Sequence, residues 1–213
     1  MIKTIKDLIG SNTPAQAEDT KKIVLIDPAD LQGPPEPDMR IVGLFSDVHE
    51  EKVAEVIHAM LYLDETNKLS KPEKQMPIKF YVSTYGGSAD DMFALYDIMR
   101  QIKETSEIHT IGLGKVMSAG VLLLASGTKG KRQIGKNCRV MIHSVIAGNA
   151  GSLHNLENEL AEVKKMQEVY LDSLEKVTNL TKKQLKSFMR RKTNVYLTAE
   201  EAIKHGIADK ILE

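Results

Sequence analysis

The sequence predicts an α/β domain in which repeated β-α units form a mainly parallel sheet covered by helices. Two observations support this prediction. Apolar runs of strand length alternate with segments whose apolar residues recur at helical spacing, and this pattern is regular from Met39 onward. The length of 213 residues is ordinary for one domain and is sufficient to bury a substantial core.

Residues 1–38 lack this alternation and predict an extended, partly flexible arm ahead of a domain that covers residues 39–213. Two stretches rich in glycine, proline and polar residues, 10–14 and 33–38, interrupt the arm. Between them, the apolar residues 23–26 fit a short strand.

The first half of the domain is expected to contain two strands, each followed by a helix. The strands are predicted at residues 40–45 and 78–82. Asp47 and Glu50 have capping-box spacing at the start of the first helix, and Ser88 is the expected N-cap of the second. The apolar stripes of the two helices are Val53, Val56, Ile57, Met60 and Leu61, then Met92, Leu95, Tyr96, Met99 and Ile102.

The longest predicted helix runs from residue 153 to about residue 177, within a segment of about 146–178. Its apolar positions form a narrow seam that Gln167 interrupts, and polar residues flank the seam on both sides. The pattern alone supports two interpretations equally: the helix packs on its own domain, or it projects and packs on another subunit.

The C-terminal region carries clear signals for the ends of helices. Capping-box spacing occurs at Thr181 and Gln184 and again at Thr198 and Glu201, and Gly206 is expected to end the last helix.

The composition argues against several classes of function. Lys+Arg and Asp+Glu both total 29, so the formal net charge is zero and a nucleic-acid partner is not expected. No stretch is apolar enough to span a membrane, and no secretory signal is evident. The single cysteine, Cys138, excludes an internal disulfide, fits a reducing compartment such as the cytoplasm, and is expected to be buried and inert.

Sequence motifs for cofactors are also missing. The chain has no His-Glu-x-x-His motif and no Cys/His pairs at ligand spacing, so we expect no metal. It has no Walker loop and no Gly-x-Gly-x-x-Gly motif, so we expect no bound ATP or dinucleotide.

One serine and one histidine suggest hydrolase chemistry. Ser118 lies where an apolar strand-like stretch at residues 108–113 gives way to an apolar helix, whose first N–H groups and dipole favour negative charge. His143 ends the apolar run 140–143 before a loop of small residues. A serine with a histidine in reach suits acyl transfer, although spacing alone favours a structural histidine. The Gly-x-Ser-x-Gly elbow of α/β-hydrolases is absent because Val116 replaces its first glycine.

Gly86 and Gly87 follow the second predicted strand. Two glycines there let another backbone approach closely and expose N–H groups, as an oxyanion hole requires. A simple tight turn between strand and helix is the commoner explanation of such a pair.

These residues lie within longer motifs that closely resemble the family of Clp protease proteolytic subunits (the ClpP family). The matching segments extend in one order over about residues 39–213. They read S-T-Y-G-G, G-K-V-M-S-A-G-V-L-L-L-A-S-G-T-K-G-K-R, R-V-M-I-H and Y-L-T-A-E-E-A-I-K-H-G-I-A-D-K-I-L. The resemblance implies a crotonase-like α/β fold, serine peptidase chemistry and two stacked seven-membered rings that enclose a chamber.

The resemblance also assigns roles to residues. It makes Ser118 the nucleophile, His143 the base, and the N–H groups of Gly87 and Ala119 the oxyanion donors. Gly86 and Ser144 are expected to contact substrate. The long helix becomes the family's handle, which interdigitates between rings and favours an intersubunit role.

The sequence departs from the family at three places. Asn194 stands four positions before Thr198, where the family has the aspartate of its catalytic triad; Asp209 and Asp172 are possible substitutes that do not match that position. The arm does not match the family's axial loop. Tyr85 and Val145 stand where the family has prolines beside the substrate groove.

We therefore expect an ATP-independent serine endopeptidase core with a Ser-His-Asn triad, acting on unfolded polypeptides with an AAA+ unfoldase as partner. The alternative is a catalytically weak or inactive structural subunit of a mixed ring. A crotonase-type enzyme acting on an acyl thioester ranks last, because that chemistry has no evident need for a Ser/His pair.

Overall fold

The computed structural model describes residues 39–190 and 194–212, and the predicted arm with its strand at residues 23–26 lies outside them. Strands and helices alternate along the described chain, as predicted. The elements are β1 (Ile41–Leu44), α1 (Glu50–Leu69), the 3-10 turn η3 (Pro72–Lys74), β2 (Ile78–Thr84), α2 (Ala89–Ile102), β3 (Ile108–Met117), α3 (Ala119–Ala125), β4 (Gln133–Ile134), β5 (Arg139–Ile142), α4 (Leu153–Val177), α5 (Lys182–Arg190), β6 (Val195–Leu197), α6 (Ala199–Lys204) and β7 (Lys210–Ile211).

The sheet is mainly parallel, in the order β1-β2-β3-β4-β7. One edge of β3 pairs with two strands in turn: residues 111–112 pair with β4, and residues 115–117 pair with β5. β6 adds to β5 in the antiparallel direction. The long strand β3 therefore joins the two parts of the sheet.

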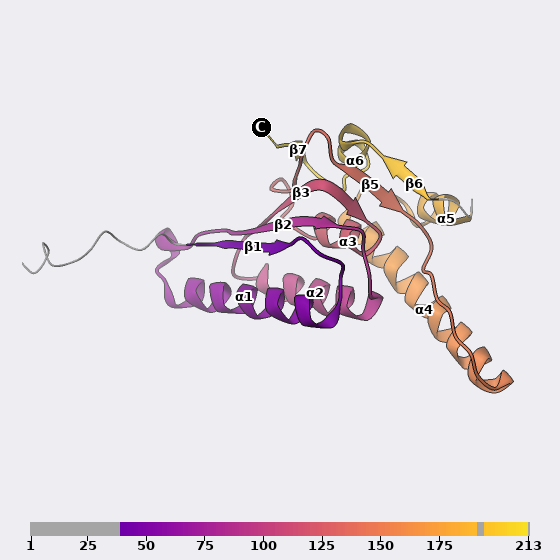
Figure 1. Cartoon of the computed structure of the whole chain (residues 1–213). Helices are drawn as coiled ribbons and strands as arrows, with labels where there is room; N and C mark the ends of the chain where they lie inside the picture. Colours follow the sequence, from indigo (N-terminus) through magenta and orange to yellow (C-terminus); the bar gives the residue numbers. More distant parts are fainter. Residues whose placement is uncertain (1–38, 191–193, 213) are drawn as a thin grey trace, which may run out of the picture. The chain divides into compact units, whose positions relative to one another are not determined.

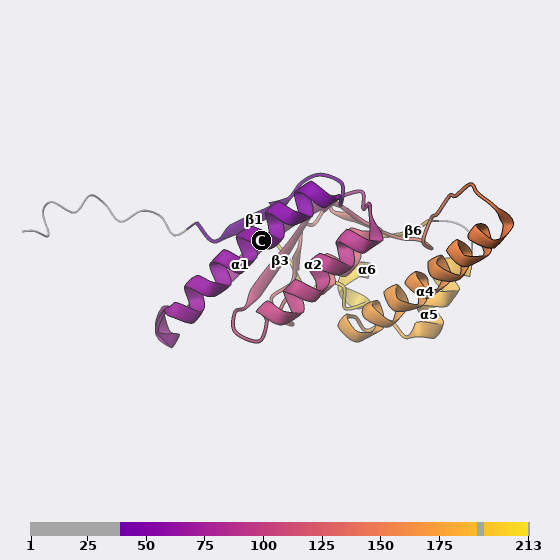
Figure 2. The ribbon, with the colours of Figure 1, turned by 90° about the horizontal axis from the view of Figure 1, so that it is seen from below.

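Helices α1 and α2 run side by side on one face of the sheet (Figures 1 and 2). The residues of the predicted stripe of α2 are all buried, as are alternate residues of β2, so this face forms the core. Helix α3 is buried along its whole length. The prediction of an α/β fold with a mainly parallel sheet covered by helices is confirmed.

The expected helix starts are confirmed at three of four places. Ser88 accepts the N–H of Asp91 at 3.2 Å, and both C-terminal capping boxes form. Gly206, at φ 71°, follows the C-cap of α6 as predicted. The capping box at Asp47 and Glu50 is wrong, because α1 begins two residues later, after the N-cap His49. Val48 instead forms a parallel bridge with Gly87, which keeps the chain extended before the helix.

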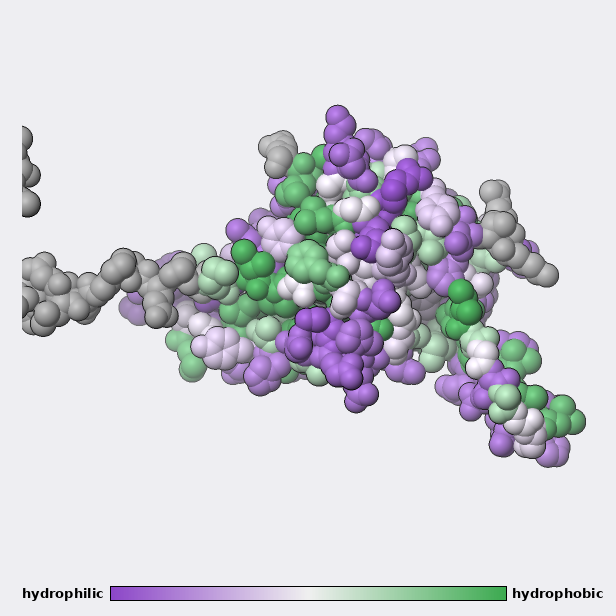
Figure 3. Space-filling view, viewed as in Figure 1, coloured by the Kyte–Doolittle hydropathy of each residue, from purple (hydrophilic) through white to green (hydrophobic). Residues whose placement is uncertain are grey.

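Helix α4 packs on the domain only through its C-terminal part. Its buried residues fall between 170 and 174, while the other end projects away from the sheet (Figure 1). Figure 3 shows hydrophobic and hydrophilic residues together on this projecting segment. Its exposed apolar residues are Leu153, Leu156 and Leu160.

Arg132 ties the C-terminal ends of two helices to the end of the chain. Its Nη1 donates to the carbonyl oxygens of Ala125, at 3.0 Å, and Val177, at 2.7 Å, which are the last residues of α3 and α4. Its Nε and Nη2 bond both carboxylate oxygens of Asp209, at 2.9 and 2.5 Å. This buried guanidinium thus bonds the ends of α3 and α4 and the carboxylate that precedes β7.

Two further findings concern single features. Cys138 is buried as expected, and burial raises the pKa of its thiol to about 11. Within the described residues, no helix has the length and apolar character needed to cross a membrane.

Replacing Asp209 with asparagine is expected to destabilise the fold by roughly 3 kcal/mol, because it leaves the Arg132 charge buried without a counter-charge. Urea unfolding at pH 7 measures this change in the free energy of unfolding. The matched control is Asp97→Asn, which removes an exposed pair with Arg100 and is expected to change stability by less than about 0.5 kcal/mol. Equal effects of the two changes would contradict this account.

The same pair predicts a pH dependence. Burial alone would raise the pKa of Asp209, but the hydrogen bonds from Arg132 outweigh burial and lower it. Because the folded-state pKa lies below the unfolded one, the stabilisation is complete above about pH 4 and is lost as pH falls through the folded-state pKa. The D209N variant should therefore lose part of the acid sensitivity of the parent.

Candidate active site

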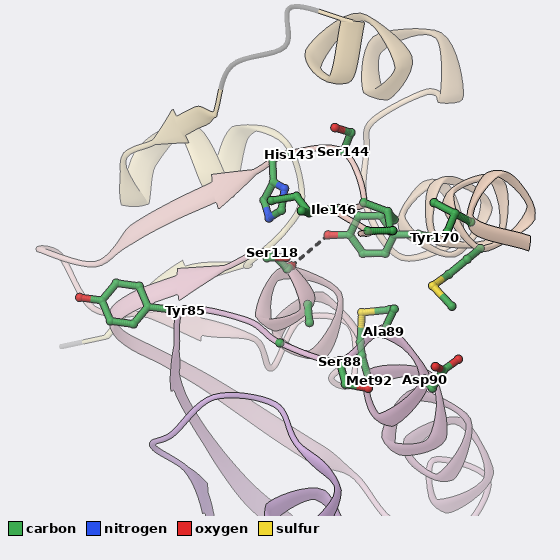
Figure 4. A pocket seen from close by; sticks show the side chains of 16 residues that line it. Tyr85, Ser88, Ala89, Asp90, Met92, Ser118, His143, Ser144, Ile146 and Tyr170 are labelled. Carbon is green, nitrogen blue, oxygen red and sulfur yellow. Dashed lines mark hydrogen bonds between the residues drawn. The ribbon is translucent and has the colours of Figure 1, made fainter. Parts of the chain in front are cut away.

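Three strand ends meet at one cleft of about 550 Å³. Gly87 follows β2, Ser118 follows β3 and His143 follows β5, and all three line the cleft. The register of β3 and β5 pairs Met117 with Met141, and the Ser118 N–H donates to the Met141 carbonyl at 2.8 Å. The carboxyl ends of neighbouring parallel strands thus bring Ser118 and His143 together, with the imidazole on the side of Ser118 (Figure 4).

Ser118 has an unusual backbone conformation, with φ of 53° and ψ of −120°. Among the described residues it is the one non-glycine residue with positive φ. It occupies the N-cap of α3, yet its hydroxyl does not cap the helix. No hydrogen bond joins the Ser118 hydroxyl to His143 within the described chain. The hydroxyl is therefore left for chemistry in the cleft.

Gly86 packs directly behind this serine. It lies at φ 108°, and a Cβ added there would come within 2.6 Å of the Ser118 Cβ. It is buried and is not among the residues that line the cleft, so its predicted substrate contact stays a prediction. Its position indicates a different need: the serine can occupy its turn only because residue 86 has no side chain.

Gly87 and Ala119 offer backbone amides to the cleft. The bridge to Val48 uses the carbonyl of Gly86 and the N–H of Ser88, and the Gly87 N–H takes part in neither bond. Ala119 is the first residue of α3, where helix geometry leaves N–H groups without partners in the helix. Both residues line the cleft together with Ser118, and their role as oxyanion donors stays a prediction.

Asn194 directly precedes β6, the strand that pairs with β5. The last pair of this ladder is Val195 with Ile142. If the antiparallel register continued by one residue, Asn194 would lie across from His143. Asn194 is exposed, and no hydrogen bond between it and His143 is present among the described residues.

The two substitute carboxylates are bound elsewhere. Asp209 bonds Arg132 and the N–H of Gly130, and Asp172 pairs with Lys182. Of these three candidates, Asn194 is the one that directly adjoins the strand paired with β5, and its role in a triad stays a prediction.

The inner part of α4 forms one wall of the cleft, which the sequence did not reveal. Val163, Met166 and Tyr170 face the cleft, and Met92 of α2 adds to the apolar lining. Gln167, which interrupts the apolar seam, accepts the N–H of Val145 at 3.3 Å and so ties α4 to the loop after His143. The sequence did hold one signal for these contacts. Gln167 lies within the apolar seam, and a polar group in such surroundings requires a partner.

Two residues at the rim of the cleft, Ser144 and Tyr85, point in different directions from Ser118 (Figure 4). The Ser144 side chain points away from Ser118 (Figure 4), and Ser144 also lines a second hollow of about 210 Å³ between α4 and α5. Tyr85 is exposed, with its ring 4.6 Å from the Lys115 ammonium.

Among the described residues, no group of three or more His, Cys, Asp or Glu side chains could hold a metal ion.

Comparison with known proteins identifies the family. The model of the Clp protease family matches residues 37–213. The ATP-dependent Clp protease proteolytic subunit of Deinococcus radiodurans is 34% identical over 174 residues, which cover 82% of this chain and 80% of that protein. The chain belongs to the Clp protease family, as the sequence motifs indicated, and is a ClpP-type protease core.

Replacing Gly86 with alanine is expected to destabilise the fold by about 2–4 kcal/mol, since the new methyl group would overlap the Ser118 side chain at a positive φ. Chemical denaturation measures the effect. The control is Gly148→Ala, because no atom lies within 4 Å of that Cβ position, and its effect is expected to stay below about 0.5 kcal/mol. A Gly86→Ala variant as stable as the control would show that this close approach is not required.

Proposed function

We propose that this chain is the ATP-independent serine endopeptidase core of a self-compartmentalised protease. The observation that carries the proposal is the Ser118 turn at the end of β3, in one cleft with His143 and the amides of Gly87 and Ala119. The family to which the chain belongs supports the same chemistry.

In this proposal the Ser118 Oγ attacks the carbonyl carbon of a peptide bond while its proton passes to His143. The carbonyl oxygen becomes an oxyanion, which the Gly87 and Ala119 N–H groups stabilise. The C–N bond then breaks, and His143 gives its proton to the leaving amine. Water, deprotonated by His143, hydrolyses the acyl ester and restores Ser118.

Asn194 completes the proposed triad. Its carbonyl oxygen suits acceptance of an N–H from the imidazole, which would fix the ring orientation. An amide provides no charge to stabilise the imidazolium that forms, so we infer slower turnover than a carboxylate would give.

The substrate is proposed to be an unfolded polypeptide that lies extended along the Gly86-Gly87 segment as an added strand. The apolar lining of the cleft suits an apolar side chain beside the scissile bond. Tyr85 and Val145, together with Ser144, are the rim residues expected to modify this preference.

Assembly is proposed to follow the family, as two stacked seven-membered rings in the cytoplasm. The projecting end of α4 supports this, because Leu153 and Leu160 are 69% and 55% exposed on a single chain. Such leucines are expected to be covered by another subunit. The Deinococcus relative is named an ATP-dependent protease subunit, which supports an AAA+ ATPase as the partner that unfolds substrates.

The second candidate is a weakly active or inactive subunit of a mixed ring. Asn194 at the triad position favours it, as does the missing hydrogen bond between Ser118 and His143 in the described single chain. Retention of both Ser118 and His143 favours the active enzyme.

The Ser118→Ala variant is expected to lose hydrolysis of a fluorogenic peptide by at least 10³-fold, because it removes the nucleophile. A fluorophosphonate probe should label the parent and not the variant. Undiminished hydrolysis by purified S118A would contradict the nucleophile assignment. Absence of labelling in the parent alone, with labelling in the presence of a sister subunit, would favour the mixed ring.

The Asn194→Asp variant is expected to raise kcat by about ten-fold or more, because a carboxylate stabilises the imidazolium. Peptide hydrolysis measures this change. The control is Asn137→Asp, which adds the same charge at an exposed position between β4 and β5 and should leave kcat unchanged. If N194D and N137D behave alike, the register argument for residue 194 fails.

A further inference from the structure

Tyr170 is a buried phenol that contacts the nucleophile segment from a different element. It lies in the inner part of α4, is 5% exposed, and lines the cleft. Its hydroxyl donates a hydrogen bond of 2.9 Å to the carbonyl oxygen of Ser118 (Figure 4). Sequence periodicity accounts for the ring as part of an apolar seam, but it does not account for the hydroxyl.

The acceptor of this hydrogen bond belongs to Ser118, the residue whose backbone has a positive φ. The Ser118 oxygen also accepts the N–H of Val121 at 3.0 Å, in the first turn of α3. The positive φ of Ser118 costs of order 1–3 kcal/mol and persists only when surrounding contacts determine it. Tyr170 provides one such contact from outside the turn.

The carbonyl oxygen of Ser118 and the N–H of Ala119 belong to one planar trans peptide and point in opposite directions. A hydrogen bond that fixes the direction of this oxygen therefore fixes the direction of the Ala119 N–H. That N–H is one of the two proposed oxyanion donors, so its direction decides how well the transition state is stabilised.

We infer that Tyr170 is a positioning residue for the proposed peptidase reaction: its hydroxyl orients the Ser118–Ala119 peptide and, through it, the Ala119 oxyanion donor. The inference rests on the proposed function. Tyr170 contacts neither substrate nor the hydroxyl of Ser118 in this role. It acts through the backbone alone.

The protonation state of Tyr170 suits a permanent donor. Burial raises the pKa of its phenol above the usual range, so the hydroxyl keeps its proton and remains a donor at neutral pH. The pH dependence of catalysis is then set by other groups, and loss of the Tyr170 hydroxyl should reduce the rate without moving that dependence.

The same turn of α4 also holds the segment after the proposed base. Gln167, three residues before Tyr170, accepts the N–H of Val145. One helical turn therefore bonds the backbone beside Ser118 and the backbone beside His143.

The test is Tyr170→Phe, which keeps the ring in the cleft wall and removes the donor. We expect kcat for a fluorogenic peptide to fall about ten-fold, less than the loss of a whole oxyanion donor, because the amide is tilted and not removed. KM should change less than about two-fold, and the midpoint of the kcat–pH profile should stay in place. The matched control is Tyr96→Phe, another buried tyrosine, in α2 and outside the cleft, which should leave kcat unchanged.

A second readout needs no activity. Hydrogen exchange of the peptide that spans residues 117–124 should be several-fold faster in Y170F than in the parent, and unchanged in Y96F. Any of three outcomes would overturn the inference: a kcat of Y170F equal to that of the parent, a change in KM alone, or unchanged hydrogen exchange of this peptide. If S118A retained full hydrolysis, the proposed function would fail, and the exchange experiment would still decide whether Tyr170 holds the Ser118–Ala119 peptide.

Discussion

The parallel pairing of β3 with both β2 and β5 is the constraint on which the rest of the site depends. Because all three strands run in one direction, their carboxyl ends lie at the same edge, and the residues that follow them share one cleft. Gly87, Ser118 and His143 come from segments far apart in the sequence and have no local reason to meet. The sheet register brings them together, and β6, which begins just after Asn194, pairs with β5 in the antiparallel direction.

Around this arrangement, close contacts keep one serine in a backbone conformation that such residues seldom adopt. Gly86 leaves the space behind it, Met141 accepts its N–H, and Tyr170 bonds its carbonyl oxygen. Each contact comes from a different element. The turn is thus a product of the assembled domain and not of the local sequence, and we expect the surrounding positions to tolerate little change in volume.

Periodicity predicted most of the fold, since strands and helices here bury one face and repeat accordingly. The bounds of α4 and the buried stripe of α2 followed directly from spacing. The capping box at Asp47 failed because a long-range bridge between Val48 and Gly87 delays the helix. The partners of Gln167 and Tyr170 were also out of reach, because a polar group within an apolar seam indicates that a partner exists but not which residue of another element provides it.

The bonds of Arg132 to the last carbonyls of α3 and α4 have a mechanical consequence. They give the two helices a common anchor at their C-terminal ends, about which a rigid α4 would turn as a lever. At 1.5 Å per residue, Tyr170 lies about 10 Å from Val177 and Leu153 lies about 36 Å from it. A swing that displaces the outer tip by about 5 Å would therefore move Tyr170 by only about 1.5 Å. Large movements of the tip would thus displace the wall of the cleft only slightly.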